Sequence, residues 1–371
     1  MTDKNPARAL ATKIARFGVG AEWREEVAPQ VWWAALPLLV EERLTGLAGA
    51  AAAGGALVLD DLQRAQLRQN REAATTRVLA LERLLLRFAD AASREGIELV
   101  VLKGPVLAHR FYPDPSWRSF NDLDVLVRAA DWRRACAVLR GLGFTRELPE
   151  PRPGFDERFG KAAAHFDDAG LCVDLHRTLV LGAFGVWLDC EALFARAAPF
   201  QLAGIPLTGL DDTTVLLHAC MHASLGWSPP LLQPLRDVVQ VASNGAVDWD
   251  RFAREAEEWR MGVVVKHSFD AVRNTLDLEL PSEAVAVAAT LRQTTRERKA
   301  LAAYEKTQRS RGGMMRSTLG AIRGIGSKAA FVWDLTVPDQ AFLAARTAEG
   351  ARPSYARRLA TPIRWLLRRS G

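Results

Sequence analysis

Two aspartates stand two positions apart inside an apolar run. In the stretch 121–127, Asp122 and Asp124 alternate with Leu123 and Val125, which is typical of a β-strand with one buried face. Side chains two apart on a strand share a face, so both carboxylates point the same way, with backbones roughly 6 to 7 Å apart. Such a pair can bind a metal ion, although exposed strand faces also carry acids routinely.

A second short strand carries the same alternation. In the stretch 173–176, Asp174 and His176 occupy one face. If this strand lies beside the first at about 4.8 Å, then Asp122, Asp124 and Asp174 meet in one patch. Three such carboxylates repel one another and take up protons unless a cation compensates them. Mg²⁺ is the expected cation, because it accepts a few carboxylates together with the phosphates of a substrate.

Basic groups and a glycine precede the aspartate pair. An apolar strand ends at Lys103 and Gly104, where a glycine turn lets backbone N–H groups approach an anion and the lysine supplies a mobile positive charge. Arg118 follows, four residues before Asp122. Cations beside a metal-binding cluster of acids are the components of a nucleotide site.

The elements that position these groups follow from the hydrophobic period. Apolar residues recur every three or four positions over 6–96, which predicts an all-helical entry region, and the pattern is helical again from Asp211 onwards. A small mixed sheet embedded between helices, an α+β fold, is therefore expected. Its elements are strands 98–102 and 123–127, helices 106–111 and 131–142 with Asp131 as N-cap, and a hairpin of strands 162–166 and 171–175.

Composition excludes several classes of protein. The chain has 371 residues, of which 49% are hydrophobic and 25% charged, as in a globular protein and not in a disordered one. The four cysteines are too far apart for a zinc knuckle or a dense disulfide framework, which predicts reduced thiols in a cytoplasmic protein. Neither a secretory signal nor a run long enough to span a membrane is evident.

Charge is distributed unevenly along the chain. Residues 291–371 contain 17 Lys and Arg against 5 Asp and Glu, a net charge of +12, while the preceding residues contain 32 against 38, a net charge of −6. A basic C-terminal tail attracts phosphates on a nucleotide or RNA, an acidic peptide or a membrane surface. We expect this tail to form helices that pack on the body, with Ile363, Trp365 and Leu366 at least partly buried.

Together these motifs resemble a known family over about residues 75 to 260. The chain is similar to the largely uncharacterised bacterial nucleotidyltransferases of the polymerase-beta-like superfamily. The hydrophobic pattern together with the resemblance divides the chain into an N-terminal helical region at 1–95, a nucleotidyltransferase-type core at 96–208 and a helical domain with the basic tail at 209–371. It rests on the following residues: Leu102-Lys103-Gly104, Tyr112-Pro113, Arg118, Asp122 to Val127, Gly143-Phe144, Val173 to His176, Asp212 to His222 and Leu235 to Val239.

The resemblance also implies site residues. Asp122, Asp124 and Asp174 match the three acids that bind two Mg²⁺ ions and carry out catalysis in the superfamily. The chain departs from the family pattern at Gly104, because Pro105 follows it in place of a serine and the gap to the aspartates is longer.

This departure shifts the expected phosphate contacts. We expect part of the role of the glycine motif to pass from Gly104 to Lys103 and Arg118, on the basis of their charge and position. His176 could orient the acceptor or shuttle a proton, or it could be a strand-end histidine hydrogen-bonded to a carboxylate.

The implied activity is Mg²⁺-dependent transfer of a nucleoside monophosphate from an NTP to an acceptor, with release of pyrophosphate. The acceptor is open between a small molecule, a peptide and RNA. Two alternatives remain: a catalytically silent nucleotide- or RNA-binding protein of the same fold, and transfer of another phosphate-linked group, such as a sugar phosphate, to a peptide.

The pattern allows two interpretations for each of three further residues. His218 and His222 have the spacing of zinc ligands on a helix, but no third ligand is evident, so a packed or substrate-facing helix is favoured. Asp237 either forms an ion pair within its helix or lines the acceptor cleft.

Overall fold

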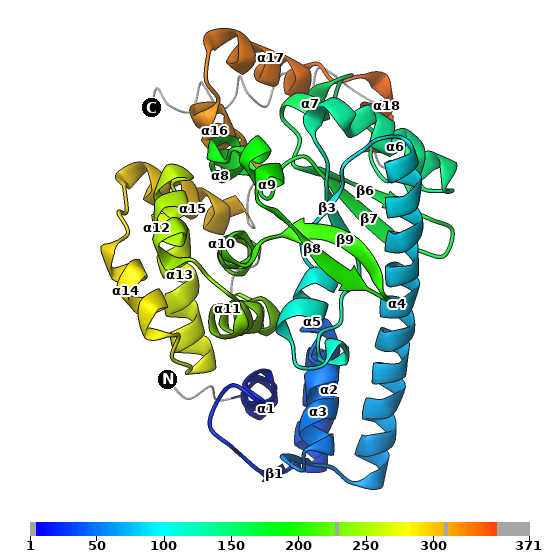
Figure 1. Ribbon diagram of the computed structural model, residues 1–371, viewed down its shortest axis with the longest axis vertical. Helices are drawn as coiled ribbons and strands as arrows, with labels where there is room; N and C mark the ends of the chain where they lie inside the picture. The colour runs from blue at the N-terminus through cyan, green and yellow to red at the C-terminus, as the bar shows by residue number, and fades with distance from the viewer. Residues whose placement is uncertain (1–4, 227–229, 308–310, 347–371) are drawn as a thin grey trace, which may run out of the picture.

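A seven-stranded mixed sheet forms the centre of the computed structural model (Figure 1). The structure describes residues 5–226, 230–307 and 311–346. The strand order is β5-β6-β7-β4-β3-β9-β8. These strands are β3 (Val100–Val101), β4 (Leu123–Leu126), β5 (Thr145–Arg146), β6 (Ala162–Phe166), β7 (Cys172–His176), β8 (Ala197–Leu202) and β9 (Ile205–Leu210).

The strands that carry the acids lie at the middle of this sheet. β4 is antiparallel to β3 and parallel to β7, and β6 and β7 form the expected antiparallel hairpin. Every residue of β4 is buried, so both faces of the sheet are covered at this point. The α+β architecture predicted from the sequence is confirmed.

The hairpin of β8 and β9 has no counterpart in the sequence prediction. Its turn has two residues, Ala203 and Gly204, because Leu202 pairs with Ile205. Both turn residues have positive φ, 50° and 78°, as a type I′ turn requires. Alanine is an unusual residue at such a position, so the Asn-Gly or Asp-Gly pattern that announces these hairpins is missing.

The N-terminal region is helical except for one short pair of strands. β1 (Glu25–Glu26) and β2 (Leu57–Val58) pair in parallel, so the prediction of an all-helical entry region is wrong at these four residues. Two-residue strands are too short to leave a period in the sequence. The helices of this region are α1 (Pro6–Ala15), α2 (Pro29–Glu41), α3 (Thr45–Ala53) and α4 (Asp61–Arg94).

Helix α4 dominates one side of the molecule. It has 34 residues, which corresponds to roughly 50 Å of length. Asp60 and Gln63 form a capping box at its start, which satisfies otherwise unpaired backbone groups. In the view of Figure 1 the sheet lies between α4 and the two helices α10 (Asp212–Leu225) and α11 (Leu232–Asn244).

Short helices connect the strands. Asp131 stands at the N-cap position of α6, but its carboxylate pairs with Arg134 at 2.7 Å and makes no capping hydrogen bond. The expected capping role of Asp131 is therefore wrong. The connecting helices are α5 (Pro105–Phe111), η1 (Pro115–Trp117), η2 (Ala129–Asp131), α6 (Trp132–Gly141), α7 (Phe155–Arg158), α8 (Gly182–Trp187) and α9 (Cys190–Ala195).

The C-terminal part is helical as far as it is described. Residues 347–371, with the predicted contacts of Ile363, Trp365 and Leu366, lie outside the described residues. No helix in the described ranges is long and apolar enough to cross a bilayer. The remaining helices are α12 (Trp249–Glu258), α13 (Gly262–Ala271), η3 (Val272–Leu276), α14 (Ser282–Thr290), α15 (Thr295–Thr307), α16 (Arg311–Ala321), α17 (Ile325–Thr336) and α18 (Gln340–Ala345).

One hydrophobic core joins these regions. The same cluster of buried side chains contains Trp32 of α2, Phe88 of α4, Val125 of β4 and Leu216 of α10. The four cysteines, Cys136, Cys172, Cys190 and Cys220, are free thiols. The sheet is thus held rigidly between helices from both ends of the chain.

Candidate active site

The register of β4 and β7 places two carboxylates side by side. Asp124 pairs with Asp174 in the parallel ladder, so their side chains leave the same face of the sheet. Leu123 and Val125, which alternate with the acids, are fully buried. The burial of these apolar residues fixes the strand, because a slip of one residue would move the carboxylates to the other face.

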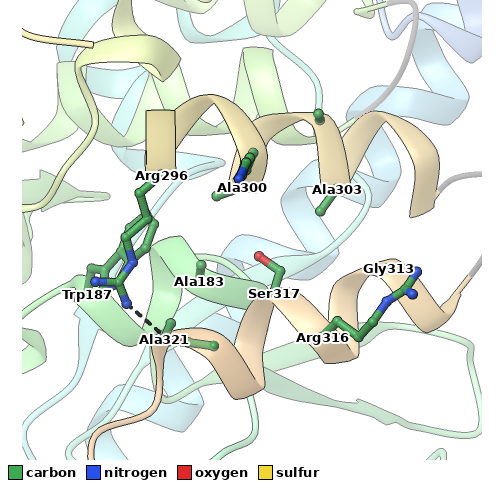
Figure 2. Close-up of a pocket in the computed structure, with 12 residues that line it drawn as sticks. Ala183, Trp187, Arg296, Ala300, Ala303, Gly313, Arg316, Ser317 and Ala321 are labelled. Atoms are coloured by element: carbon green, nitrogen blue, oxygen red, sulfur yellow. Dashed lines mark hydrogen bonds between the residues drawn. The ribbon is translucent and has the colours of Figure 1, made fainter. Parts of the chain in front are cut away.

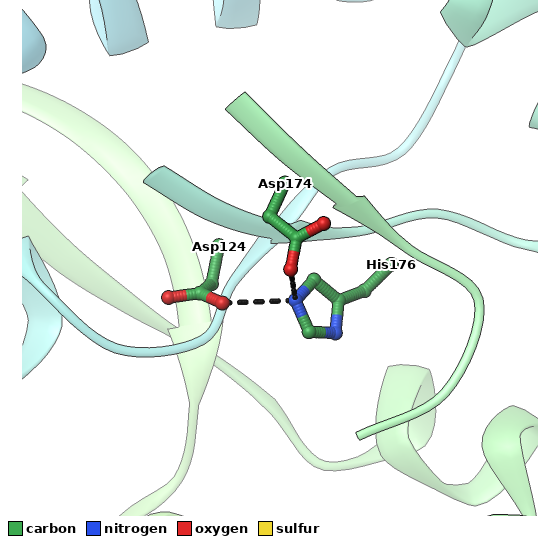
Figure 3. A group of neighbouring side chains, drawn as sticks. All are labelled: Asp124, Asp174 and His176. Atoms are coloured by element: carbon green, nitrogen blue, oxygen red, sulfur yellow. Dashed lines mark hydrogen bonds and ion pairs between the residues drawn. The ribbon is translucent and has the colours of Figure 1, made fainter. Parts of the chain in front are cut away.

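His176 lies between these two carboxylates (Figure 3). Its Nε2 is 2.8 Å from Asp124 Oδ1 and 3.1 Å from Asp174 Oδ2, and its Nδ1 is 3.0 Å from the carbonyl oxygen of Thr178. All these partners are acceptors, so both ring nitrogens act as donors and the ring is an imidazolium. Burial and the nearby Lys161 lower the pKa of His176, but the hydrogen bonds to the two carboxylates outweigh them and raise it overall.

Two lysines complete the charge balance of the cluster. Lys103 Nζ is 3.0 Å from Asp124 Oδ1, and Lys161 Nζ is 3.6 Å from Asp174 Oδ2. Burial alone would raise the pKa of Asp124, but Lys103 and His176 bring it well below its usual value. For Asp174, burial is likewise outweighed by His176 and Lys161, which lower its pKa. Both carboxylates are therefore ionised at neutral pH.

Asp122 differs from the other two aspartates. It is half-buried, and no salt bridge within the described part of the chain involves it. Burial and the negative charge of Asp124 raise the pKa of Asp122. An acid whose charge is opposed by its neighbour in this way is stabilised by an added cation.

The donor set suits a divalent cation. Oxygen atoms of Asp124 and Asp174 and a ring nitrogen of His176 lie within 4.8 Å of one another. As an imidazolium His176 has no free lone pair, so the carboxylates supply the ligand atoms. The carboxylate oxygens match the preference of Mg²⁺ for hard ligands. Asp122, two residues before Asp124, stands outside this compact group of three but next to it along the strand.

Gly104 forms the turn between β3 and α5. Its φ is +44°, and a Cβ atom at this position would meet the ring of Phe120 at 3.3 Å. Only glycine adopts such a backbone without strain while tolerating this close approach. The turn directs Lys103 toward Asp124, so the structure brings Lys103 to the cluster of acids.

Arg118 is not brought to this cluster. It is 2% exposed, and its Nε and Nη2 donate to the two carboxylate oxygens of Asp237, both at 2.9 Å. Tyr112 donates to the same carboxylate at 2.8 Å. This geometry favours a structural role for Arg118, which connects the core to α11, over the expected contact with a phosphate.

The same contacts decide against an ion pair between Asp237 and its helix neighbour Arg236. Its partner is Arg118, 119 residues away, and not its neighbour Arg236. The guanidinium of Arg236 donates instead to the backbone oxygens of Ala15 and Phe17. Asp237 is thus a buried structural acid in a second charged cluster, which we call the Arg118–Asp237–Tyr112 network.

A cavity of about 380 Å³ opens beside Lys103 and Lys161. His218 and His222 of α10 line it, and no third metal-binding side chain groups with them among the described residues. Burial and Lys103 lower the pKa of His218 to about 3, and burial also lowers that of His222. Both histidines therefore face the cavity as neutral rings.

A larger cavity of about 750 Å³ lies apart from the acids, between α8, α15 and α16 (Figure 2). Trp187 and Arg296 stack on its wall, with the guanidinium 5.2 Å from the ring centroid. None of the cluster carboxylates lines it. The smaller cavity is therefore the candidate active site, because it is lined by Lys103 and Lys161, which pair with Asp124 and Asp174.

The sequence analysis missed Lys161 as a site residue. The lysine stands one residue before β6, which pairs with β7. The predicted hairpin could have drawn attention to it, since the residue that flanks one strand of a hairpin lies near the end of the other.

Comparison with known proteins identifies the family of this chain. The profile of a protein family described as uncharacterised nucleotidyltransferases matches residues 28–277. The chain belongs to this family, and it is a nucleotidyltransferase. The nucleotidyltransferase family expected from the resemblance is confirmed. None of the curated proteins matches the chain.

Two solved structures resemble the chain more distantly. The antibiotic-resistance factor ANT(2'')-Ia is 16% identical, with a TM-score of 0.33 over 64% of this chain and 98% of its own. An antigenic nucleotidyltransferase-like protein from Paracoccidioides brasiliensis is 13% identical, with a TM-score of 0.32 over 57% of this chain and 97% of its own. The family match over residues 28–277 defines the activity.

Proposed function

We propose that the chain transfers a nucleoside monophosphate from an NTP to an acceptor hydroxyl, with Mg²⁺ bound by Asp122, Asp124 and Asp174. The observation that carries this proposal is the pairing of Asp124 with Asp174 in adjacent strands, beside two lysines and a cavity. Nucleotidyl transfer is the activity of the family; the ion, the co-substrate and the roles of these residues are our proposal.

The metal fits the donor set because the available atoms are mainly carboxylate oxygens. When bound, Mg²⁺ supplies charge neutralisation of the phosphates and an in-line arrangement of the reacting oxygens. The lysines have a complementary role. Each pairs with a carboxylate through a flexible ammonium group, which can turn toward the negative charge of a triphosphate.

Asp174 is the proposed proton acceptor. Its carboxylate is ionised because His176 and Lys161 lower its pKa. It is also less buried than Asp124, and its partner Lys161 lines the cavity, so an acceptor can approach it. His176 is the positioning residue, since its hydrogen bonds fix the orientation of both carboxylates.

Thermal unfolding with nucleotides tests the proposal. Mg²⁺ together with an NTP at 100 times its dissociation constant should stabilise the protein by about 2.7 kcal/mol. Asp124→Asn keeps the shape of the side chain and should abolish this stabilisation together with transfer of an α-³²P label. Asp90→Asn is the matched control, because Asp90 is an exposed acid of α4 paired with Arg94. Equal stabilisation of Asp124→Asn and wild type would refute the metal role of Asp124.

A further inference from the structure

The cavity beside the acids has a wall of distinctive chemistry. Apart from Lys103 and Lys161, none of the described residues in its lining carries a charged side chain. Both lysines stand next to the carboxylate cluster, where the triphosphate is placed under the proposed function. The rest of the lining is mostly apolar: Leu179, Val180, Leu181, Met221, Leu225, Gly226 and Met314, with His218, His222 and Tyr304 as the polar members.

The histidines do not make this wall cationic. His218 and His222 are neutral at physiological pH, because burial and the positive charge of Lys103 disfavour their protonation. No carboxylate stands among the described residues of the lining either. A cationic acceptor would therefore meet no compensating charge on the helical side of the cavity, and burying an unpaired charge is costly.

Tyr304 places a hydrogen-bonding group in this wall. Its side chain is 9% exposed, and its hydroxyl has no hydrogen-bond partner among the described residues. Buried tyrosine hydroxyls normally have a partner. The ring is held against Phe184 at a centroid distance of 6.0 Å, so the hydroxyl is fixed in position with its hydrogen-bonding capacity unused.

Gly182 allows this arrangement. Its φ is +80°, and a Cβ there would meet Met314 Sδ at 2.4 Å and the ring of Tyr304 at 3.2 Å. The absence of a side chain lets α15 and α16 close over the start of α8. The fold thus brings Tyr304, about 180 residues distant from Asp122 in sequence, to the same cavity as Lys103 and Lys161.

We infer that the acceptor is an uncharged small molecule with an apolar body and a hydroxyl nucleophile, held by the apolar wall and by a hydrogen bond from Tyr304. This inference rests on the proposed function. The acceptor oxygen forms a bond to the α-phosphorus as the bond from that phosphorus to pyrophosphate breaks. The proton of the hydroxyl passes to the carboxylate of Asp174.

Three alcohols that share a cyclohexylmethanol scaffold, one neutral, one cationic and one anionic, test the inference. They are 4-methyl-, 4-aminomethyl- and 4-carboxy-cyclohexylmethanol, offered to the full-length protein with Mg²⁺ and the four α-³²P-labelled NTPs. We expect label on the neutral alcohol at a rate at least ten times that on either charged one. Tyr304→Phe should lower transfer to the neutral alcohol about ten-fold, while the stabilisation by Mg²⁺ and NTP stays unchanged.

A charge introduced into the wall provides a second test. Leu181 lines the cavity and is 45% exposed, so Leu181→Glu should fold. This variant should raise transfer to the aminomethyl alcohol at least three-fold relative to the other two. Leu62→Glu is the matched control, because Leu62 is a 59% exposed leucine of α4 that does not line this cavity; it should leave the preference unchanged.

The outcomes separate this inference from the proposed function. Stabilisation by Mg²⁺ and NTP without preferred transfer to the neutral alcohol overturns the acceptor class and leaves nucleotide binding in place. A cationic or anionic alcohol used as well as the neutral one also overturns it. Absence of any stabilisation by Mg²⁺ and NTP refutes the proposed function itself.

Discussion

Two charged clusters lie in the interior of this protein, and they differ in how their acids are paired. In the Arg118–Asp237–Tyr112 network, one carboxylate receives three hydrogen bonds from rigid, fully buried partners. In the Asp124–Asp174–His176 cluster, the carboxylates share one imidazolium and two flexible lysines at the edge of a cavity. A third acid, Asp122, lies beside them without a salt bridge among the described residues.

Under the proposed function, this difference separates charges that hold the fold together from charges that bind a ligand. An acid whose oxygens are all taken by rigid donors has no capacity for a ligand, whereas flexible ammonium groups can exchange a carboxylate for a phosphate. The raised pKa of Asp122 shows the same contrast. Negative charge accumulates around Asp122 and Asp124, whereas the charge of Asp237 is neutralised by Arg118. We therefore expect substitutions in the first cluster to change stability and substitutions in the second to change binding.

The largest expected effect comes from breaking the buried network. Arg118→Met leaves the carboxylate of Asp237 buried without its cation, which should cost about 3 to 5 kcal/mol of unfolding free energy. Urea denaturation measures this cost. The double variant Arg118→Met/Asp237→Leu removes both charges and should lose less than the sum of the single variants. A stable Arg118→Met protein with weakened NTP binding would restore the phosphate role expected from the sequence.

A smaller effect on stability should come from the neutral ring of His218, which lines the cavity beside the Asp124–Asp174–His176 cluster. In the unfolded chain His218 binds a proton below pH about 6.5, but in the folded protein its pKa is about 3. The unfolded state therefore binds more protons between these values, and stability falls as pH falls. From pH 7 to pH 5 this group should cost about 2 kcal/mol.

Urea denaturation of His218→Gln checks this pH dependence. The variant lacks the titrating ring, so its loss of stability between pH 7 and pH 5 should be about 2 kcal/mol smaller than that of the wild type. Equal losses in the two proteins would contradict the burial of a neutral ring at this position.

The smallest effect on stability is expected at Lys103. Lys103→Met should lower the unfolding free energy by less than Arg118→Met does, because His176 still pairs with Asp124. Affinity for the NTP should fall about ten-fold or more, the typical result of losing a charge-assisted hydrogen bond. Calorimetric titration measures the affinity, and Lys266→Met, at another lysine paired with an aspartate, is the control. Unchanged affinity would make Lys103 a structural residue like Arg118.

Local periodicity accounts for the parts of the fold that the sequence predicts. The alternation around Asp124 and Asp174 predicts two strands with acids on one face, and the structure has them as β4 and β7. The β6–β7 hairpin and the helical period of α4 and α10 are equally visible in the sequence. These features need only neighbouring residues, so a single sequence reveals them.

The pairing of distant residues is beyond such reasoning. Arg118 stands four residues before Asp122, which suggested a shared site, but the chain brings Asp237 to it from α11. Tyr304 reaches the cavity from α15, where nothing in the local helical pattern marks it. The β8–β9 hairpin was missed for a local reason, because its turn uses Ala203 at a positive φ.

Helix α4 has a consequence for dividing this protein into pieces. Its Arg77 donates hydrogen bonds to the carbonyl oxygens of Asn121 and Gly170, the loops that lead into the two acid-bearing strands. Its Phe88 belongs to the same core as Val125 of β4. A recombinant fragment that began at residue 96 would lose both the clamp on these loops and one side of the core. Any minimal catalytic fragment therefore has to include α4, and a surface tag or fusion partner is better placed before α1 than between α4 and β3.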